Sequence, residues 1–441
     1  MVPWKLPAEL ALWVNRLEAL LHRRLAGRLT TVLVGMLFAR GRRTVASWLR
    51  AANVGQAFPA YYYFLGSLGR NVESVANALL RLMVQILVPG ECLLWAIDDT
   101  PTQRYGPKVQ GAGIHHNPTP GPAEQKFVYG HVWVTLALLV RHPLWHTIGL
   151  PLRAFLYVRR KDMLKLPRRT KVPFRTKLEM AGELIACTAQ QLHWLGKTMR
   201  AVVDGAYAKR PVLKKAKAHN VVVVSRLRKD ARLHEVPKPP RRRRPGRPRL
   251  YGKRISLAKR SAHPRGWQTG VFTLYGRSET KTYKSFVAAY PPAGGAIRVV
   301  IVKENDGWVA FFTTNPQDTV AQVLEAVADR GAIEQNFHDL KEVHGVGRQQ
   351  VRNYWANVAA YHLNLWLHTL VELWAWARPK EELCDRSESP WDDPDRRPSH
   401  ADRRNALRRS CIEQEYRDAR AHQRLSRKLR RVIAGLLRIA A

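Results

Sequence analysis

The sequence predicts an α/β fold, and the order of its apolar segments is the main reason. Three runs rich in β-branched and aromatic residues, at 92–99, 127–140 and 147–158, have the composition of buried strands. A helical stretch at 175–195 and a fourth strand at 199–204 follow them. Because a helical crossover normally returns the chain parallel to an earlier strand, the fourth strand should pair with the first.

The first 90 residues have a different pattern, with Leu, Val, Ala and Arg at helical spacing and few turn signals. They predict a helical domain that binds DNA. Within it, residues 42–55 read as a short basic helix followed by a turn at Asn53 and Gly55. This segment is either part of a helix-turn-helix reader or an ordinary basic helical hairpin.

The charge of the chain indicates what it binds. Its 74 Lys and Arg residues face 34 Asp and Glu residues, a formal net charge of +40 that favours a polyanion such as nucleic acid. The apolar runs at 30–39 and 132–140 are shorter than the roughly 20 residues that cross a bilayer, so we expect no membrane association. The N-terminus lacks the layout of a secretory signal, which predicts a cytoplasmic protein.

Acidic residues follow two of the predicted strands. Asp98 and Asp99 end the first strand and Asp204 ends the fourth, so pairing of these strands would bring the carboxylates to one sheet edge, where α/β folds bind ligands. Neighbouring buried carboxylates repel each other and need a cation. Two Mg²⁺ ions suit an all-oxygen ligand set. Alternatively, the acids of "DDTPT" only cap a turn.

A third carboxylate lies on a helix predicted over residues 327–345. At about 100° per residue, Arg330, Glu334 and Lys341 fall within roughly 40° of one another beside the apolar stripe. Glu334 could therefore complete the metal site while the two cations hold phosphates. The alternative is an ordinary solvated Arg–Glu pair one helical turn apart.

Together, "AIDDT", "VVDGAYAKR" and "DRGAIEQNFHDLK" resemble the three catalytic motifs of DDE transposases of bacterial insertion sequences. The most similar group carries a signature of Tyr, two residues, Arg, three residues, Glu, six residues and Lys. Arg330, Glu334 and Lys341 match this spacing, whereas Val327 occupies the Tyr position and removes one expected DNA contact. The resemblance covers roughly residues 90–375.

The resemblance implies a ribonuclease H-like catalytic core with Asp99, Asp204 and Glu334 as catalytic metal ligands. Asp99 is preferred to Asp98 because the first family Asp directly precedes Thr. Two Mg²⁺ ions, with Mn²⁺ able to substitute, are the implied cofactors. The implied partner is double-stranded DNA, both element ends and target, bound by a homodimer in a synaptic complex. Such a protein would be associated with the nucleoid.

The spacing of the acids predicts an inserted domain. Asp204 and Glu334 are 130 residues apart, too far for a loop in a compact core, and short strands are predicted between them. Members of the resembled family carry a β-rich insertion here. The predicted regions are a helical DNA-binding domain at 1–90, a catalytic core at 91–228 and 319–378, an inserted β-rich domain with a basic loop at 229–318, and a basic helical tail at 379–441.

The basic loop of the insertion, residues 237–254, is rich in Pro and Arg and should stay extended. Its Gly-Arg-Pro triplet resembles a hook that reads the minor groove of A·T-rich DNA, but we favour a sequence-independent phosphate clamp. The residues expected to contact DNA are Arg241, Arg242, Arg243, Arg244 and Arg247.

These observations predict a transposase that cleaves DNA at element ends and joins the freed 3′-hydroxyl to target DNA. Two alternatives stay open: a catalytically inactive or domesticated DNA-binding protein, and a ribonuclease H-like nuclease without strand transfer. The intact acids Asp99, Asp204 and Glu334 weigh against the first, and the inserted domain weighs against the second.

Overall fold

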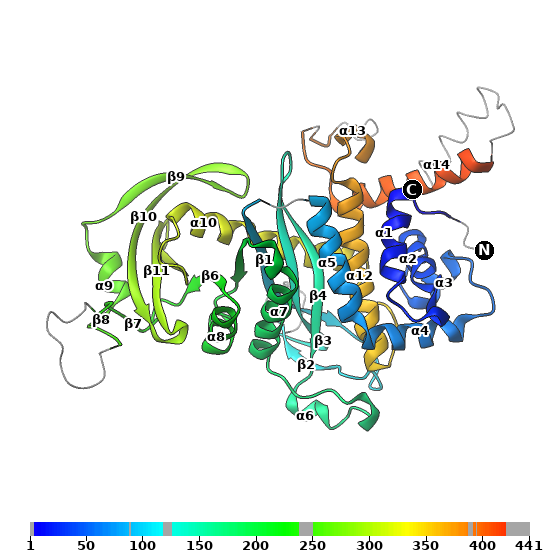
Figure 1. The fold of residues 1–441 in the computed structure, drawn as a ribbon, viewed down its shortest axis with the longest axis horizontal. Helices are drawn as coiled ribbons and strands as arrows, with labels where there is room; N and C mark the ends of the chain where they lie inside the picture. The colour runs from blue at the N-terminus through cyan, green and yellow to red at the C-terminus, as the bar shows by residue number, and fades with distance from the viewer. Residues whose placement is uncertain are drawn as a thin grey trace.

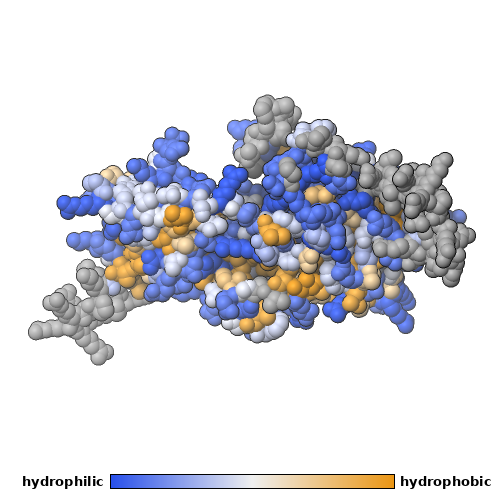
Figure 2. All heavy atoms as spheres, turned by 90° about the horizontal axis from the view of Figure 1, so that it is seen from above, coloured by the Kyte–Doolittle hydropathy of each residue, from blue (hydrophilic) through white to orange (hydrophobic). Residues whose placement is uncertain are grey.

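The computed structural model describes residues 4–87, 90–117, 126–237, 250–386, 391–393 and 395–419. It shows an elongated molecule, with strands at one end, a helical region at the other, and the two meeting around the centre (Figure 1). On the face shown in Figure 2, hydrophilic residues predominate and separate apolar patches lie between them, as the high charge leads one to expect. No helix in the described ranges is both long and apolar enough to span a membrane.

The centre of the molecule is a mixed sheet in which strands run in the order β4-β3-β1-β5-β6. These strands are β1 (Cys92–Gln103), β3 (Phe127–His142), β4 (His146–Tyr157), β5 (Thr198–Val203) and β6 (Val221–Leu227). β3 is antiparallel to β1 and β4, whereas β1, β5 and β6 are parallel. The predicted parallel pairing of the first and fourth strands is therefore confirmed. The short strand β2 (Gly113–His116), which was not predicted, pairs with the start of β3.

Helices cover both faces of this central sheet, which explains why its strands are apolar on both sides. Trp95 and Ile97 on one face, and Ala96 and Val202 on the other, are all completely buried. On one face, α7 (Lys177–Leu192) contacts β3 and β4, and α8 (Arg210–Ala218) contacts α7 and β6. A later helix, α11, contacts β1 and β4 on the other face.

The free edge of β4 is covered by the long helix α12 (Tyr354–Ala375). The indole Nε1 of Trp366 donates to the carbonyl of Leu152 at 3.0 Å, and the Ala154 N–H donates to Nε2 of His362 at 3.2 Å. Side chains of the helix therefore satisfy backbone groups that an open sheet edge would leave unpaired.

The N-terminal region is helical, as predicted. It comprises α1 (Ala8–Glu18), α2 (Arg28–Phe38), α3 (Val45–Ala51), α4 (Phe58–Arg70) and α5 (Val72–Leu87). The turn after α3 is at Asn53, with a φ of +55°. α4 packs closely on α12 at Gly69, where an added Cβ would lie 1.9 Å from the carbonyl oxygen of Trp355. Only glycine allows this approach.

Beyond β6, the sheet continues through strands from the predicted insertion, because β12 pairs antiparallel with β6 and is followed by β11 and β10. The elements are β7 (Leu233–His234), β8 (Arg254–Ile255), α9 (Leu257–Ala262), β9 (Gln268–Leu274), β10 (Arg277–Tyr290), β11 (Gly295–Glu304) and β12 (Gly307–Thr313). This part is β-rich, as expected, and it extends the central sheet (Figure 1). β10 was not predicted because its first half is polar and partly exposed.

The helix predicted over 327–345 is wrong in its bounds. The chain forms α10 (Val320–Asp329) and α11 (Gly331–Glu342), and the first helix ends where the second begins, at Arg330. A capping box formed by Thr319 and Gln322 starts α10 before the predicted position. At this junction, the Arg330 side chain donates to Asp98 of β1.

The C-terminal region contains α13 (Lys380–Leu383) and α14 (His400–Ala419). α14 packs against α12 and α2, with Leu407 and Cys411 completely buried. The predicted basic tail thus contributes a helix to the core within its described part. The apolar and basic run at 424–440 lies outside the described residues.

Candidate active site

Strand pairing places the predicted acids where the parallel pairing of β1 with β5 ends. The prediction that Asp98 and Asp99 end their strand or cap a turn was wrong, because β1 continues to Gln103 through its antiparallel pairing with β3. In the parallel pair of β1 and β5, Ile97 lies opposite Val203. Asp98 and Asp204 are the next residues along the two strands, so their backbones are neighbours. Asp204 follows the end of β5 and accepts a hydrogen bond from the Ala206 N–H at 2.9 Å.

Asp98 points toward α11. Its Oδ2 accepts a hydrogen bond from Nη1 of Arg330 at 2.6 Å, and Nη2 of the same guanidinium donates to Oε1 of Glu334, also at 2.6 Å. The side chains of Asp98 and Arg330 are about one-fifth exposed, whereas that of Glu334 is 60 % exposed. Arg330 therefore joins a carboxylate of the sheet to the carboxylate of the helix.

Asp99 points to the opposite face, because successive residues of a strand alternate in direction. Its Oδ2 accepts from Nζ of Lys177 at 2.7 Å, and its Oδ1 accepts from the Tyr207 hydroxyl at 2.5 Å. Lys177 is the first residue of α7, and Tyr207 lies in the turn after Asp204. Burial and the nearby Asp99 raise the pKa of Tyr207 above its usual value, so the hydroxyl stays protonated and donates.

The electrostatics of the Asp98 side favour an added cation. Burial raises the pKa of Asp98 to about 6, the Arg330 guanidinium opposes this rise, and repulsion from Asp99 and Asp204 adds to it. The donors available are carboxylate oxygens, the ligands that Mg²⁺ prefers. The chemistry of the donor set thus fits a hard divalent metal.

The carboxylates are nevertheless not gathered around one point. Within the described ranges, no group of three or more acids has its oxygen atoms within 4.8 Å of one another. The acids surround the Arg330 side chain, which supplies the positive charge between Asp98 and Glu334.

Lys341 lies further along α11, on the wall of a groove of about 1490 Å³. The groove is also lined by residues 101–109 at the end of β1 and by residues 346–352. Arg104 fixes its wall by donating to the carbonyls of Gly347 and Val351, both at 2.7 Å. The other basic residues along the groove are Arg42, Lys108, Arg348 and Arg352.

The other residues predicted to contact DNA belong to the basic loop. Arg241, Arg242, Arg243, Arg244 and Arg247 lie outside the described residues. Sequence reasoning did not identify Lys177 and Tyr207 as partners of Asp99. A signal for Lys177 was the capping sequence that starts α7, and one for Tyr207 was its position three residues after Asp204.

A family model described as DDE superfamily endonuclease matches residues 16–285. The chain belongs to this family. The match includes Asp98, Asp99 and Asp204 but ends before Arg330 and Glu334. DDE-type nucleases act on DNA and generally use divalent metal ions. No curated protein matches the sequence.

Proposed function

We propose that this DDE superfamily member is a transposase that cleaves DNA at the ends of an insertion sequence and transfers the 3′-hydroxyl into target DNA. The observation that supports this most strongly is the Arg330 bridge between Asp98 of β1 and Glu334 of α11, beside the end of β5. The bridge joins residues of the first and third motifs that lie 232 positions apart, and Asp204 of the second motif is the backbone neighbour of Asp98 across the β1–β5 pair.

Asp204, Glu334 and one carboxylate of β1 would hold two Mg²⁺ ions, for which Mn²⁺ can substitute. When bound, such a metal pair activates the attacking oxygen and stabilises the leaving oxygen of a phosphodiester. With metal bound to the carboxylates, Arg330 would no longer be needed as their partner and could turn toward a DNA phosphate. Binding a phosphate is the role expected from the place of Arg330 in the signature.

The β1 ligand is either Asp98 or Asp99. The resemblance favours Asp99, because it directly precedes Thr100. The geometry supports Asp98, because this side chain lies on the same face as Arg330 and Glu334. Asp99 would have to give up Lys177 and Tyr207 to reach that face. We therefore propose Asp98 as the metal ligand and Asp99 as a buried acid that orders the loop after β5.

The strand order β4-β3-β1-β5-β6, with the first three antiparallel and the last three parallel, supports a ribonuclease H-like core. On this proposal, residues 91–228 and 319–378 form the core, 229–318 the insertion, 1–90 a DNA-binding domain and 379–441 the tail. The insertion would carry bound DNA beyond β6.

DNA would follow the groove beside Lys341 to the carboxylates, because five basic side chains line this groove in addition to that of Arg104. The arginine run at 241–247 would clamp phosphates elsewhere on the same DNA. Two copies of the chain would hold the two element ends in a synaptic complex.

The deciding experiment is an assay of Mg²⁺-dependent cleavage and joining on DNA that carries the ends flanking its own gene. Cleavage followed by joining supports the transposase. Cleavage without joining under conditions that allow synapsis indicates a nuclease, and tight binding without cleavage in Mg²⁺ or Mn²⁺ indicates an inactive DNA-binding protein. The Glu334→Gln protein is the matched control, since it should bind the same DNA without cutting it.

A further inference from the structure

Three buried histidines meet on the side of α11 that faces away from the candidate active site. His344 follows α11, His368 lies on α12, and His400 is the first residue of α14. One ligand nitrogen of each lies within 4.8 Å of the others, and none of the three residues is more than 4 % exposed. Across the described ranges, no other group of three or more His, Cys, Asp or Glu residues meets this condition.

We propose that His344, His368 and His400 bind a divalent cation of the zinc class. Imidazole nitrogens suit Zn²⁺ and the later first-row metals, whereas Mg²⁺ prefers oxygen ligands. This site is therefore chemically distinct from the carboxylates around Arg330, and it does not depend on the proposed transposase activity.

Two of the rings already face each other correctly for an ion. Nε2 of His344 and Nε2 of His400 are 2.8 Å apart and share a hydrogen bond. His400 uses Nδ1 to donate to Glu372, so once the His344 proton moves to Nδ1 of its ring, both Nε2 atoms present a lone pair to an ion. Two nitrogens bound to one tetrahedral Zn²⁺ at about 2.1 Å lie roughly 3.4 Å apart, so the pair needs to separate by only about 0.6 Å. His368 is stacked on His400, with ring centroids 3.8 Å apart, and must rotate out of this stack to ligate.

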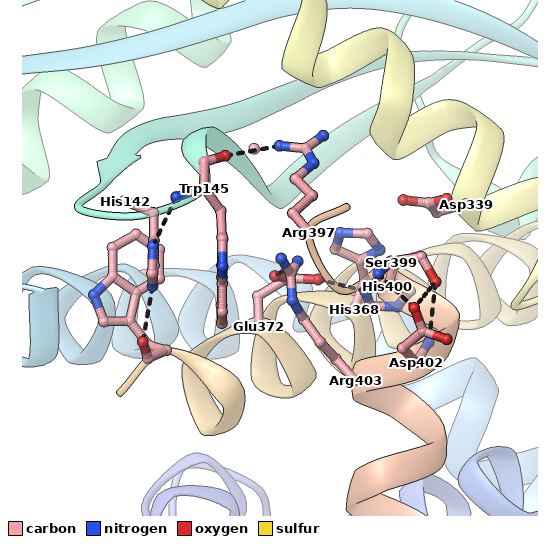
Figure 3. Close-up of polar contacts among 12 residues, drawn as sticks. His142, Trp145, Asp339, His368, Glu372, Arg397, Ser399, His400, Asp402 and Arg403 are labelled. Atoms are coloured by element: carbon pink, nitrogen blue, oxygen red, sulfur yellow. Dashed lines mark hydrogen bonds and ion pairs between the residues drawn. The ribbon is translucent and has the colours of Figure 1, made fainter. Parts of the chain in front are cut away.

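An acid behind the cluster fixes the ligating nitrogen of His400. Oε1 of Glu372 accepts a hydrogen bond from Nδ1 of His400 at 2.6 Å (Figure 3). This bond leaves Nε2 of His400 to face Nε2 of His344. Metal-bound histidines almost always donate their other ring N–H to an acceptor, which is a carboxylate, a backbone carbonyl or water. The second oxygen of Glu372 accepts a hydrogen bond from Arg403 at 2.6 Å, so the positive charge of Arg403 is neutralised beside the proposed metal site.

Two unpaired buried atoms also point to a ligand. His368 Nδ1 and Asn336 Oδ1 have no hydrogen-bond partner among the residues that the structure describes, whereas Nε2 of His368 accepts from the Asn336 amide at 3.1 Å. If Nδ1 ligates an ion, the ring proton moves to Nε2, and Asn336 can turn its amide so that Oδ1 accepts this proton. Both atoms are then satisfied, at the expense of the present Asn336 bond to the carbonyl of Gly149.

A cavity of about 240 Å³ adjoins the cluster, and its lining includes His368 and His400, the carboxylates of Glu372 and Asp339, and the cations Arg396, Arg397 and Arg403. It offers room for a water molecule as the fourth ligand and a nearby carboxylate to offset the charge of the ion. Bound metal would join α12, the first turn of α14 and the segment after α11. It would thus hold the C-terminal helix against the helix that carries Glu334.

The test uses the full chain with Co²⁺ alone as a spectroscopic probe, in the Asp204→Asn background so that the carboxylate site is weakened. We expect one Co²⁺ per chain, with the visible absorption of nitrogen-ligated tetrahedral cobalt, displaced by one equivalent of Zn²⁺. His344→Gln and His400→Gln should weaken binding at least tenfold and remove the rise in unfolding temperature caused by Zn²⁺. His362 is a buried histidine of α12 outside the cluster, so His362→Gln should change neither the Co²⁺ affinity nor the rise in unfolding temperature caused by Zn²⁺.

Unchanged Co²⁺ affinity in both His344→Gln and His400→Gln, or no binding by the folded Asp204→Asn protein, would overturn the proposal. If the histidine variants do not fold, zinc-edge X-ray absorption of the protein with one Zn²⁺ bound decides instead. A shell with three imidazole nitrogens supports the site, and an all-oxygen shell rejects it.

Discussion

The two faces of β1 differ more than its sequence indicates. Asp98 and Asp99 are adjacent and chemically identical, yet Asp98 lies with Arg330 beside the exposed Glu334, whereas Asp99 lies with Lys177 and Tyr207. One acid faces an incomplete arrangement of carboxylates that suits an added cation. The other already has two donors, and its neighbours leave no obvious role for a metal.

The difference shows that position along a strand decides the chemistry of an acid as much as its motif does. A shift of one residue moves a side chain to the other face of a sheet. The face that carries α11 also receives the third predicted acid, so the choice between the two aspartates is a choice between faces.

The largest expected effect is on the rate of DNA cleavage, which should distinguish Asp98 from Asp99 directly. Asp98→Asn should reduce Mg²⁺-dependent cleavage about a thousandfold or more, as Asp204→Asn should, because each removes a metal ligand with little change in shape. Asp99→Asn should retain substantial cleavage. Rates are measured on end-bearing DNA at saturating protein, with DNA binding followed by fluorescence anisotropy to show that each variant still binds.

The opposite ranking, with Asp99 indispensable and Asp98 dispensable, would restore the assignment made from the motif. It would also mean that Asp99 leaves Lys177 and Tyr207 when DNA or metal binds.

The sequence was sufficient for the central strands and for the neighbourhood of Asp98 and Asp204, because composition and crossover rules act locally. The motif preferred Asp99 because it directly precedes Thr100, but it could not show which of the two acids faces Glu334, since the contact that shows this, from Arg330 to Asp98, joins residues 232 positions apart. The histidine cluster was missed for the same reason. Its members lie on three separate segments and follow no spacing rule that a single sequence reveals.

The second effect is a dependence of stability on pH that arises from Asp98. Burial raises the pKa of Asp98 from 3.8 to about 6, so the folded state binds this proton more tightly than the unfolded state. The stability gained from this tighter proton binding by Asp98 is therefore fully present below pH 3.8 and is lost as the pH rises through 6. Relative to wild type, metal-free Asp98→Asn should gain up to about 3 kcal/mol between pH 4 and 7.

The measurement is urea unfolding in EDTA at several pH values for wild type and for Asp98→Asn. The quantity of interest is the difference in unfolding free energy, because other titrating groups cancel in it. A difference that stays constant across this range would show that Asp98 is already well compensated by Arg330, and would weaken the case for an added cation.

A smaller effect concerns the cation between the carboxylates. Arg330→Gln leaves Asp98 and Glu334 without their shared partner, and should lower the stability of the metal-free protein by about 1 to 3 kcal/mol. Mg²⁺ should then raise the unfolding temperature more in this variant than in wild type. Lys341→Gln is the matched control, since it removes one positive charge from α11, the helix that begins directly after Arg330. An equal response to Mg²⁺ in all three proteins would contradict the bridging role of Arg330.

The smallest expected effect concerns Lys177, which pairs with Asp99 on the face of β1 opposite Asp98. The Lys177 side chain is 37 % exposed, so its ion pair with Asp99 is screened by solvent and Lys177→Gln should change stability by less than about 1 kcal/mol. If Asp99 does not ligate metal, the Mg²⁺ concentration for half-maximal cleavage should also stay unchanged. If Asp99 is the ligand, Lys177 competes with the ion for its Oδ2, and removing the lysine should lower that concentration. A Mg²⁺ titration of cleavage by wild type and Lys177→Gln distinguishes these outcomes even where Asp99→Asn is too unstable to assay.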